Sequence, residues 1–568
     1  MEFPRPSFLN YTPVPLAFGT SGLRGLVQDI TDLEAYVNVK GTLRFLLEVN
    51  DISATSVVTI GGDLRPSTDR IMRAAVQAII DLGLQAENAG KIPTPALVLR
   101  AISNRRAGVM VTGSHIPFDR NGIKINKSGG EVLKSDEAGI ITEVERVRAE
   151  EYGRSAENSM FDGCGMLKRP PELPALDRTA EESYVNRYLK TFARDSLGGL
   201  RVMVFQHSAV GRDLLARILR DLGAEVIAVG RSDTFIPVDT ENITDDQLVR
   251  LQEFASAADL GGALPHAIVS TDGDSDRPLV SAVLLADEAM SKRARVRFLP
   301  GDLLGIVVAE YLRADAAAVP ISANDAVECR LRERQITLQK TKIGSPYVIS
   351  ALDELRGSGK VTRIVGWEAN GGFLTGSDIA VGESKLAALP TRDAILPILA
   401  NLSAAVAQGI SLAELWNRLP SRFGRAGLID NFPTAASQGI LARIVPPGNV
   451  VEVQFDRNGT ALDRSRADGT VAPLASVVVE EWGRRKEILQ NYFVKALGFD
   501  DIERINVLDG VRIYFRNGDI AHIRPSGNAP QLRIYANADS QARADQIVEF
   551  ALREPGGILR RLERALAS

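Results

Sequence analysis

The chain has 568 residues, of which 45% are hydrophobic and 24% are charged, and at roughly 150 residues per domain this length predicts three or four domains. The formal charge of −4, with no run of basic residues, argues against a nucleic-acid partner. Cys164 and Cys329 lie far apart in the sequence, which excludes a disulfide framework and a cysteine-rich metal site and fits a reducing compartment.

No segment of the sequence indicates export or membrane insertion. The first residues, Met1–Pro6, carry an early acid and two prolines and have no apolar core, unlike a signal peptide. The uncharged stretch from Ala394 to Ala413 is as long as a membrane span, but Pro397 and Asn401 interrupt it and favour a buried helix. We therefore expect a soluble, cytoplasmic protein with no membrane partner.

Short β-branched runs alternate with helical periodicity over most of the chain. The run Val57–Ile60 predicts a strand, the apolar spacing from Ile71 to Leu82 predicts a helix, and Ala107–Val111 predicts the next strand. The same rhythm restarts at residues 201–205 and continues from a helix at 302–312 to a strand at 363–366. This pattern is typical of α/β domains with mixed, helix-covered sheets.

The last part of the chain has a different pattern. Three strand-like runs, 511–515, 520–523 and 532–535, lie close together, Asn517-Gly518 marks a hairpin, and a helix is expected at 542–552. This predicts an α+β domain. Stretches rich in charge, glycine and proline at 153–174, 291–301 and 420–433 read as linkers. We expect four domains, at 1–174, 175–298, 299–422 and 423–568.

The acidic loop Asp272-Gly273-Asp274-Ser275-Asp276-Arg277 follows a predicted apolar strand. Three carboxylates at alternate positions of an extended segment point the same way, and a hard divalent cation such as Mg²⁺ relieves their repulsion. An EF-hand is excluded because Val283 stands where its twelfth-position glutamate is needed. The alternative is a solvated acidic turn.

Other polar loops also follow predicted strands, where open α/β sheets bind ligands. Thr112–Pro117 exposes Ser114 beside His115 as a candidate nucleophile, although this loop alone favours an ordinary polar turn. Glu368, Asn370 and Gly371 suit hydroxyl groups, and an ordinary Asn-Gly turn is equally compatible. The segment 524–533 offers two arginines, a hydroxyl and backbone N–H groups as an anion cradle, or alternatively an exposed turn. A glycine loop, 19–25, carries Arg24.

Together these loops indicate phosphoryl transfer to a hydroxyl group. Such a reaction needs positioning and charge neutralisation more than covalent chemistry from the protein. No P-loop or kinase signature supplies a nucleotide, so a phosphorylated Ser114 is the candidate donor.

The motifs resemble those of the α-D-phosphohexomutases, most closely the bacterial phosphomannomutase/phosphoglucomutase type. The family's T-A-S-H-N-P reads Thr112-Gly113-Ser114-His115-Ile116-Pro117 here, and in its D-G-D-G-D-R only Ser275 differs. Its G-E-x-S-G corresponds to the segment 366–371, its R-P-S-G-T-E-P to 524–530, and its F-G-T-x-G-x-R-G to 18–25. The resemblance implies three α/β domains and a C-terminal α+β domain.

The resemblance also implies an isomerase. Mannose 6-phosphate and mannose 1-phosphate would interconvert, as would the glucose phosphates, through phosphoserine and a hexose 1,6-bisphosphate. Ser114 and the three aspartates would hold Mg²⁺. The implied catalytic residues are Ser114, His115, Lys124, Arg24 and Arg277; the implied substrate-binding residues are Lys342, Glu368, Asn370, Gly371, Arg524, Ser526, Gly527, Asn528 and Arg533. The only expected partner is a small hexose phosphate, and the chain is a monomer or homodimer.

Departures from the family pattern affect the sugar and phosphate loops. Asn370 replaces a serine, Trp367 is inserted before Glu368, Ser345 stands where some relatives have histidine, and Ala529 replaces a glutamate. These changes leave the preference among mannose, glucose and glucosamine phosphates open. Two other functions are considered: a metal-dependent sugar phosphatase, and a sugar-phosphate-binding protein without catalysis.

Overall fold

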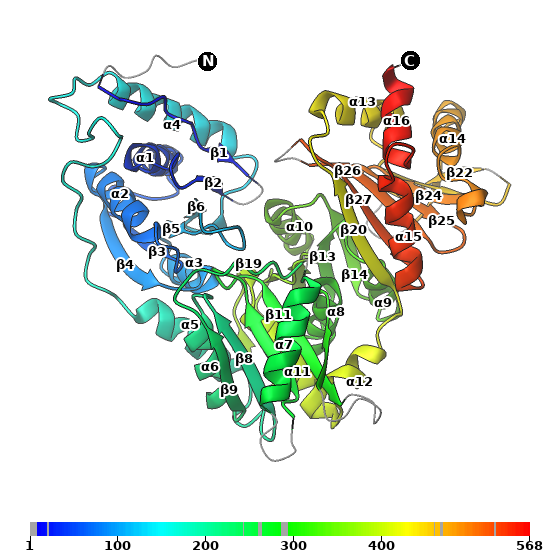
Figure 1. Cartoon of the computed structure of the whole chain (residues 1–568), viewed down its shortest axis with the longest axis horizontal. Coiled ribbons are helices and arrows are strands. Elements are labelled where there is room, and N and C mark those ends of the chain that lie inside the picture. The colour runs from blue at the N-terminus through cyan, green and yellow to red at the C-terminus, as the bar shows by residue number, and fades with distance from the viewer. Residues whose placement is uncertain are drawn as a thin grey trace. The chain divides into compact units, whose positions relative to one another are not determined.

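The fold is described from a computed structural model, which covers residues 8–19, 22–241, 243–258, 264–285, 294–458, 460–465, 470–526 and 530–567. The chain divides into two compact units (Figure 1). The first unit contains Met1–Ala314 and Ser345–Trp416, and the second contains Asp315–Gly344 and Asn417–Ser568.

The first sheet of the first unit follows the predicted βαβ rhythm. Its strand order is β1-β2-β6-β5-β3-β4, with β7 paired to β6, and β3 runs parallel to β4 and β5. The apolar spacing predicted around Ile71 buries one face of α2 against the sheet core. The elements are β1 (Ala17–Phe18), β2 (Leu23–Leu26), α1 (Asp32–Glu48), β3 (Val57–Gly62), α2 (Thr68–Asp81), β4 (Gln85–Lys91), α3 (Thr94–Ser103), β5 (Gly108–Val111), β6 (Arg120–Lys127), β7 (Gly130–Glu131) and α4 (Glu137–Tyr152).

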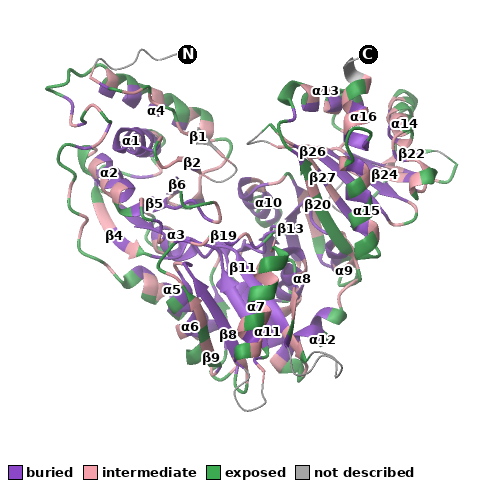
Figure 2. Ribbon diagram, viewed as in Figure 1, coloured by how far each residue is buried: buried purple, intermediate pink, exposed green. Residues whose placement is uncertain are grey.

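The second sheet repeats this pattern with the order β12-β11-β10-β8-β9. The pairs β8–β9 and β8–β10 are parallel, whereas β10, β11 and β12 are antiparallel. Strands β8 and β11 are largely buried in Figure 2. The elements are α5 (Thr179–Thr191), β8 (Arg201–His207), α6 (Arg212–Asp221), β9 (Glu225–Arg231), α7 (Asp245–Ala257), β10 (Ala267–Thr271), β11 (Pro278–Leu285) and β12 (Ala294–Phe298).

The first unit ends with a further group of antiparallel strands and helices. Strand β16 pairs with β15 and β19, and β17 pairs with β18. The uncharged stretch at 394–413 forms the buried helix α11 and starts α12. Within the described residues, no helix has both the length and the apolar character needed to cross a membrane. The elements are α8 (Gly301–Tyr311), α10 (Ser345–Gly357), β15 (Ile364–Trp367), β16 (Phe373–Thr375), β17 (Ile379–Val381), β18 (Ser384–Leu386), β19 (Leu389–Asp393), α11 (Ile395–Gln408) and α12 (Leu412–Asn417).

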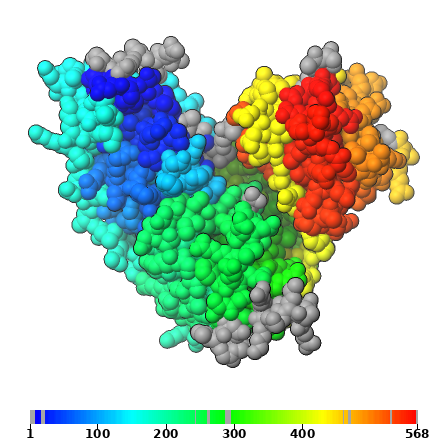
Figure 3. Space-filling view, viewed as in Figure 1, coloured from blue at the N-terminus to red at the C-terminus, as the bar shows by residue number. Residues whose placement is uncertain are grey.

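The second unit carries an eight-stranded antiparallel sheet in the order β20-β27-β26-β25-β24-β21-β22-β23. Helix α15 packs on β20 and β27 and contacts α16. The residues of these two C-terminal helices form the red part of the surface in Figure 3. Its elements are β13 (Ala316–Pro320), α9 (Ala326–Glu333), β14 (Thr337–Thr341), β20 (Phe423–Ile429), α13 (Thr434–Ile444), β21 (Glu452–Phe455), β22 (Ala461–Asp463), β23 (Ala472–Pro473), α14 (Ser476–Gln490), a 3₁₀ turn (Lys495–Leu497), β24 (Ile502–Asn506), β25 (Val511–Phe515), β26 (Ile520–Pro525), β27 (Leu532–Ala538), α15 (Gln541–Leu552) and α16 (Ile558–Ala567).

The structure confirms the α/β class with a C-terminal α+β part. The prediction of a linker at 420–433 is wrong, because Phe423–Ile429 forms the edge strand β20 along β27. Its Gly- and Arg-rich sequence resembles a loop because the strand pairs on one side only and is mostly exposed. The four loops that follow β5, β10, β15 and β26 all join antiparallel neighbours. Each candidate loop is therefore held at both ends by a paired strand.

Candidate functional site

Ser114 lies in the loop that joins β5 to β6. Its side chain is fully buried and its hydroxyl donates to Asp272 Oδ2 over 2.6 Å. The backbone N–H of Ser114 donates to Thr112 Oγ1 over 2.8 Å, and its φ of 55° lies in the left-handed region, which is uncommon outside glycine. The loop thus holds the hydroxyl in a fixed position against the acidic loop.

A buried arginine supports this loop from behind. The Arg65 guanidinium donates to the carbonyl oxygens of Ser114 (2.9 Å), Ile116 (2.6 Å), Pro117 (2.6 Å) and Arg120 (3.1 Å). The same group donates from Nε to Asp63 Oδ2 over 3.1 Å and stacks 3.9 Å from the centroid of the Phe235 ring. One side chain therefore ties together the backbone on both sides of the loop.

The three aspartates predicted to bind metal lie together in the β10–β11 hairpin loop. Asp272, Asp274 and Asp276 each place a carboxylate oxygen within 4.8 Å of the others, and all three are buried. Asp272 Oδ1 accepts the backbone N–H groups of Asp276 and Arg277. The hairpin folds back on this carboxylate, which gathers the three side chains on one side of the loop.

Cationic side chains surround these carboxylates. Lys124 Nζ lies 2.6 Å from Asp274 Oδ2 and 2.8 Å from Asp276 Oδ2, and Arg277 Nε lies 3.6 Å from Asp276 Oδ1. Arg392 donates to Asp276 Oδ2 from Nε and Nη2 over 3.1 and 2.9 Å. Burial alone would lower the pKa of Lys124, but Asp274 and Asp276 raise it above its ordinary value. Lys124 is accordingly a cation.

The pKa of Asp272 moves in the opposite direction to that of Asp276. Burial and the neighbouring carboxylates of Asp274 and Asp276 raise the pKa of Asp272 well above its usual range. Burial would also raise the pKa of Asp276, but Arg392 and Lys124 hold it below its ordinary value. Asp272, whose carboxylate faces Ser114, is thus the member of the triad in which negative charge is least stabilised.

The donor set fits a hard divalent cation. Asp274 Oδ1 and Asp276 Oδ1 are buried and have no hydrogen-bond partner among the described residues. A buried carboxylate oxygen without a partner is costly unless a cation meets it. The available ligand atoms are all oxygens, which Mg²⁺ prefers. The Ser114 hydroxyl contacts the triad directly, so it fits as a fourth oxygen.

His115 and Arg24 belong to the first unit, like Ser114 and the aspartate triad. Burial, assisted by the positive charges of Arg277 and Arg24, lowers the pKa of His115 to about 2, and its Nδ1 lies 3.5 Å from Ser114 Oγ. Burial and the neighbouring guanidinium groups of Arg277 and Arg392 lower the pKa of Arg24 to about 10. At neutral pH, His115 is uncharged and Arg24 carries a positive charge.

The predicted sugar loop spans residues 368–372 between β15 and β16. Glu368 accepts from Arg392 Nη1 over 3.0 Å, and Asn370 Oδ1 accepts the N–H of Gly372 over 2.9 Å. Gly371 has a φ of 84° within this turn. The Trp367 ring is fully buried and stacked on Phe373. Trp367 is the last residue of the buried strand β15 and directly precedes the sugar loop.

The phosphate-loop candidates belong to the second unit. Arg524 and Arg533 are paired directly across β26 and β27. Arg524 Nε donates to Asp509 Oδ1 over 3.0 Å, and Asp509 Oδ2 accepts the N–H of Ile343, the neighbour of Lys342. Like charges paired across strands are unfavourable unless an anion lies between them. Ser526 is described, whereas Gly527 and Asn528 lie outside the described residues.

Sequence reasoning missed three residues of the first-unit site. Arg65 braces the serine loop, Thr94 Oγ1 donates to Asp274 Oδ2 over 2.5 Å, and Arg392 joins two loops. None belongs to a recognisable polar loop motif, and Thr94 contacts a partner 180 positions away. Only the fold could have revealed them.

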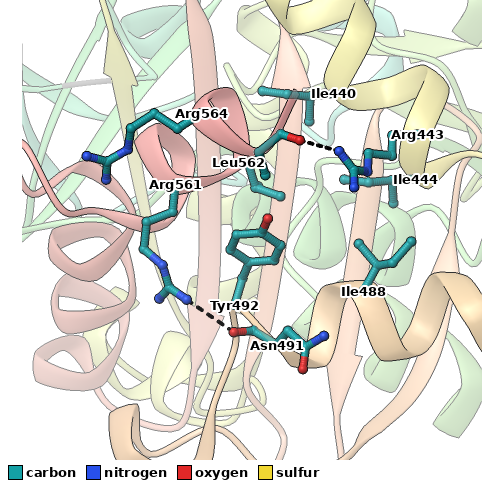
Figure 4. A pocket seen from close by; sticks show the side chains of 10 residues that line it. Ile440, Arg443, Ile444, Ile488, Asn491, Tyr492, Arg561, Leu562 and Arg564 are labelled. Atoms are coloured by element: carbon teal, nitrogen blue, oxygen red, sulfur yellow. Dashed lines mark hydrogen bonds between the residues drawn. The ribbon is translucent and has the colours of Figure 1, made fainter. Parts of the chain in front are cut away.

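A cavity of about 410 Å³ in the second unit contains none of the predicted site residues. It lies between α13, α14 and α16, over Ile440, Ile444 and Leu562, with Arg443 and Arg561 at its edge (Figure 4). Both arginines donate to backbone carbonyls, those of Ala565 and Asn491 respectively. This cavity is separate from the loops described above.

Comparison with known proteins agrees with the geometry of the site. Three family models match: phosphoglucomutase/phosphomannomutase α/β/α domain I at residues 15–151, α/β/α domain III at 300–423, and the C-terminal domain at 466–554. A phosphomannomutase of Salmonella muenchen is 35% identical over 94% of this chain and 94% of its own length. A phosphomannomutase of Sinorhizobium fredii (strain NBRC 101917 / NGR234) is 35% identical over 94% of this chain and 98% of its own length.

The fold is also found in solved structures. A phosphoglucomutase/phosphomannomutase family protein from Burkholderia thailandensis superimposes with a TM-score of 0.61 over 96% of this chain and 97% of its own, at 16% identity. The serine loop, the acidic loop and the full-length similarity agree, and the chain belongs to the phosphoglucomutase/phosphomannomutase family.

Proposed function

We propose that this protein is a phosphohexomutase that interconverts hexose 6-phosphates and hexose 1-phosphates. The observation that carries the proposal is the buried Ser114 hydroxyl, 2.6 Å from a carboxylate of the aspartate triad, whose other carboxylates contact cationic side chains. The names of the two phosphomannomutase relatives support mannose phosphate as the substrate. We extend the proposal to glucose phosphate, because a loop with one carboxylate and one amide can hydrogen-bond to hydroxyl groups that both sugars have.

The proposed reaction has two phosphoryl transfers. A hydroxyl oxygen of the bound hexose phosphate attacks the phosphorus of phosphorylated Ser114, the P–Oγ bond breaks, and the hydroxyl proton leaves to a base. The resulting 1,6-bisphosphate then presents its other phosphate. Ser114 Oγ attacks that phosphorus, the bond between the phosphorus and the sugar oxygen breaks, and the released sugar oxygen takes the proton back from the base. A phosphate is neither gained nor lost over the cycle.

The charge and position of each residue indicate its role in the proposed reaction. Lys124, Arg277 and Arg24 supply positive charge for the transferring phosphoryl group, which is the main catalytic need of such a transfer. Mg²⁺, when bound to the aspartates and Ser114, neutralises charge on the phosphoryl oxygens. His115 is uncharged and can accept a hydrogen bond beside Ser114, so His115 and Lys124 remain the candidates for handling the proton.

The remaining candidates are proposed to bind substrate. Glu368, Asn370 and Gly371 would contact sugar hydroxyls, whereas Lys342, Arg524, Ser526, Gly527, Asn528 and Arg533 would bind a phosphate group. We further propose a hexose 1,6-bisphosphate as the activator that charges Ser114. The four domains proposed for this activity are 1–174, 175–298, 299–422 and 423–568.

A phosphorus NMR assay tests the function. The protein is mixed with mannose 1-phosphate, a trace of glucose 1,6-bisphosphate and MgCl₂, and we expect mannose 6-phosphate to accumulate. Ser114→Ala should abolish the product. Ser53→Ala, which removes an exposed hydroxyl that hydrogen-bonds to the hydroxyls of Thr55 and Ser56, should not. Free phosphate as the main product would favour a phosphatase, and binding without any product would favour a binding protein.

Sugar preference needs a separate measurement. Comparing kcat/KM for mannose, glucose and glucosamine 1-phosphates identifies the preferred sugar. We expect mannose and glucose 1-phosphates to be accepted, because Glu368 and Asn370 both offer acceptors for shared hydroxyls. Turnover of glucosamine 1-phosphate alone would contradict this proposal.

A further inference from the structure

Arg392 forms ion pairs with both the acidic loop and the sugar loop, through Asp276 and Glu368. It lies on β19 and its residue is 3% exposed. Nε and Nη2 donate to Asp276 Oδ2 over 3.1 and 2.9 Å, while Nη1 donates to Glu368 Oε2 over 3.0 Å. A planar guanidinium can make these directed contacts on two sides at once, which an ammonium group cannot.

We propose that Arg392 is a positioning residue that orients a metal-binding carboxylate and a sugar-binding carboxylate together. This inference rests on the proposed function, because it deepens the roles of Asp276 and Glu368. Arg392 acts through these two side chains rather than on the reacting atoms.

The backbone beneath Arg392 is held firmly. Its neighbour Asp393 accepts hydrogen bonds from the hydroxyls of Tyr184, over 2.6 Å, and Tyr188, both on α5. The two tyrosines are fully buried. A rigid strand end is what a side chain needs if it is to fix the position of others.

The sugar loop is built against the stem of Arg392. A Cβ added at Gly372 would lie 2.5 to 2.8 Å from the Cβ, Cγ and Cδ atoms of Arg392, so only glycine permits this close approach. Glu368 closes the same loop, its N–H donating to the carbonyl of Gly372 over 3.3 Å. The arginine therefore contacts the sugar loop through both its hydrocarbon stem and its charge.

On the acidic loop, Arg392 determines which oxygen of Asp276 remains available. Lys124 and Arg392 both donate to Oδ2, whereas Oδ1 is buried with no hydrogen-bond partner among the residues the structure describes and has Arg277 Nε 3.6 Å away. Fixing Oδ2 in this way leaves Oδ1 as the oxygen that Asp276 can offer to a metal ion. Losing Arg392 would free the carboxylate to rotate.

Two binding affinities test the proposal without requiring turnover. Calorimetry measures the affinity of the protein for Mg²⁺ and for mannose 1-phosphate in wild type, Arg392→Met and Arg392→Lys. We expect Arg392→Met to weaken both by about 10-fold, a size within the range of coupled contacts. Because Arg392→Lys keeps the charge but can reach one loop at a time, it should restore one affinity and not both.

Double variants show whether Arg392 acts through the two carboxylates. In a Glu368→Gln background, Arg392→Met should change sugar-phosphate affinity less than twofold further, and in an Asp276→Asn background it should change Mg²⁺ affinity less than twofold further. Additive losses would overturn the proposal. Tighter Mg²⁺ binding by Arg392→Met would also overturn it, because that is the result of merely removing a nearby positive charge.

A matched control separates positioning from the general cost of losing a buried arginine. Arg187 is 9% exposed and lies in the same unit, but it donates to the carbonyl of Ala387 and to Thr375 Oγ1. Arg187→Met should leave both affinities unchanged. Equal losses in Arg187→Met and Arg392→Met would overturn the proposal.

The failure of the proposed function would look different. If the wild-type protein binds mannose 1-phosphate and Mg²⁺ but makes no mannose 6-phosphate, the proposed mutase function is wrong. The affinities of the Arg392 variants then still test the positioning role of Arg392. A wild-type protein that binds neither overturns both.

Discussion

Replacing Arg65 with methionine should loosen the serine loop while leaving the rest of the fold in place. Methionine keeps much of the stem volume but removes every donor from the carbonyls of Ser114, Ile116, Pro117 and Arg120. It also removes the cation from the fully buried Asp63 carboxylate. Both losses act on the same loop.

The magnitude follows from the burial of the pair. Removing one partner of a buried ion pair costs about 3 to 5 kcal/mol, because the other charge stays in the interior. Asp63 keeps hydrogen bonds from Thr68 Oγ1 at 2.9 Å and Thr112 Oγ1 at 2.7 Å, so we expect the lower end, about 3 kcal/mol. At 1.4 kcal/mol per factor of ten, this corresponds to a roughly 100-fold loss of protection of the loop's backbone amides against hydrogen exchange.

Hydrogen exchange measured on peptides from residues 112–120 gives the assay, with kcat as the second readout. Exchange is preferred to a single unfolding transition, because a chain with two compact units need not unfold in one step. Arg44→Met is the control: Arg44 pairs with Glu150 at side-chain exposures of 31% and 48%, where an ion pair contributes less than about 1 kcal/mol. Wild-type protection of residues 112–120 together with wild-type kcat in Arg65→Met would refute the reasoning.

Three further predictions concern the serine, the buried histidines and a helix contact. Freshly purified protein should carry one phosphate, about 80 Da, on Ser114, and mapping of that phosphate to another residue by mass spectrometry would contradict the assignment. Burial lowers the pKa of His207 to about 4 and that of His522 to about 3, so below pH 6.5 the unfolded chain binds protons that the folded chain does not. Stability should therefore fall from pH 6.5 toward pH 4, by about 2 kcal/mol for each histidine at pH 5, and urea midpoints independent of pH in this range would disprove it. Gly305→Ala should destabilise the protein by about 1 to 3 kcal/mol through α8, although alanine has the better helix propensity. The reason is that the added Cβ would lie 2.3 Å from Trp367 Nε1. An unchanged thermal midpoint would contradict this prediction, because it would mean that the indole ring moves away at no cost.

The loops were predictable because their chemistry is concentrated in consecutive residues. Asp272, Asp274 and Asp276 are neighbours in sequence, so their alternation alone indicated a cation site, and the triad is gathered as expected. The role of Ser114 could not be predicted from its own loop, since a serine beside a histidine is common in protein sequences. Its contact with Asp272 spans 158 positions, which no local pattern reveals.

The residues that hold these loops in place could not be predicted. Arg65 and Arg392 act at a distance along the chain, on carbonyls and carboxylates supplied by other loops. The position of Trp367 could not be predicted for a related reason: its strand is buried along its whole length, so a large ring next to a polar loop belongs to the core. The edge strand at 423–429 was taken for a linker because exposure removes the apolar alternation by which strands are recognised.

The backbone of Ser114 restricts which amino acids can carry a phosphoryl group at this position. Threonine has the same hydroxyl, but a β-branched residue at a φ of 55° is a steric outlier. Cysteine fits the backbone but offers the softer sulfur in place of the hard oxygen that Mg²⁺ prefers. Backbone geometry thus disfavours threonine and ligand hardness disfavours cysteine, so among the hydroxyl and thiol side chains of this size only serine meets both requirements.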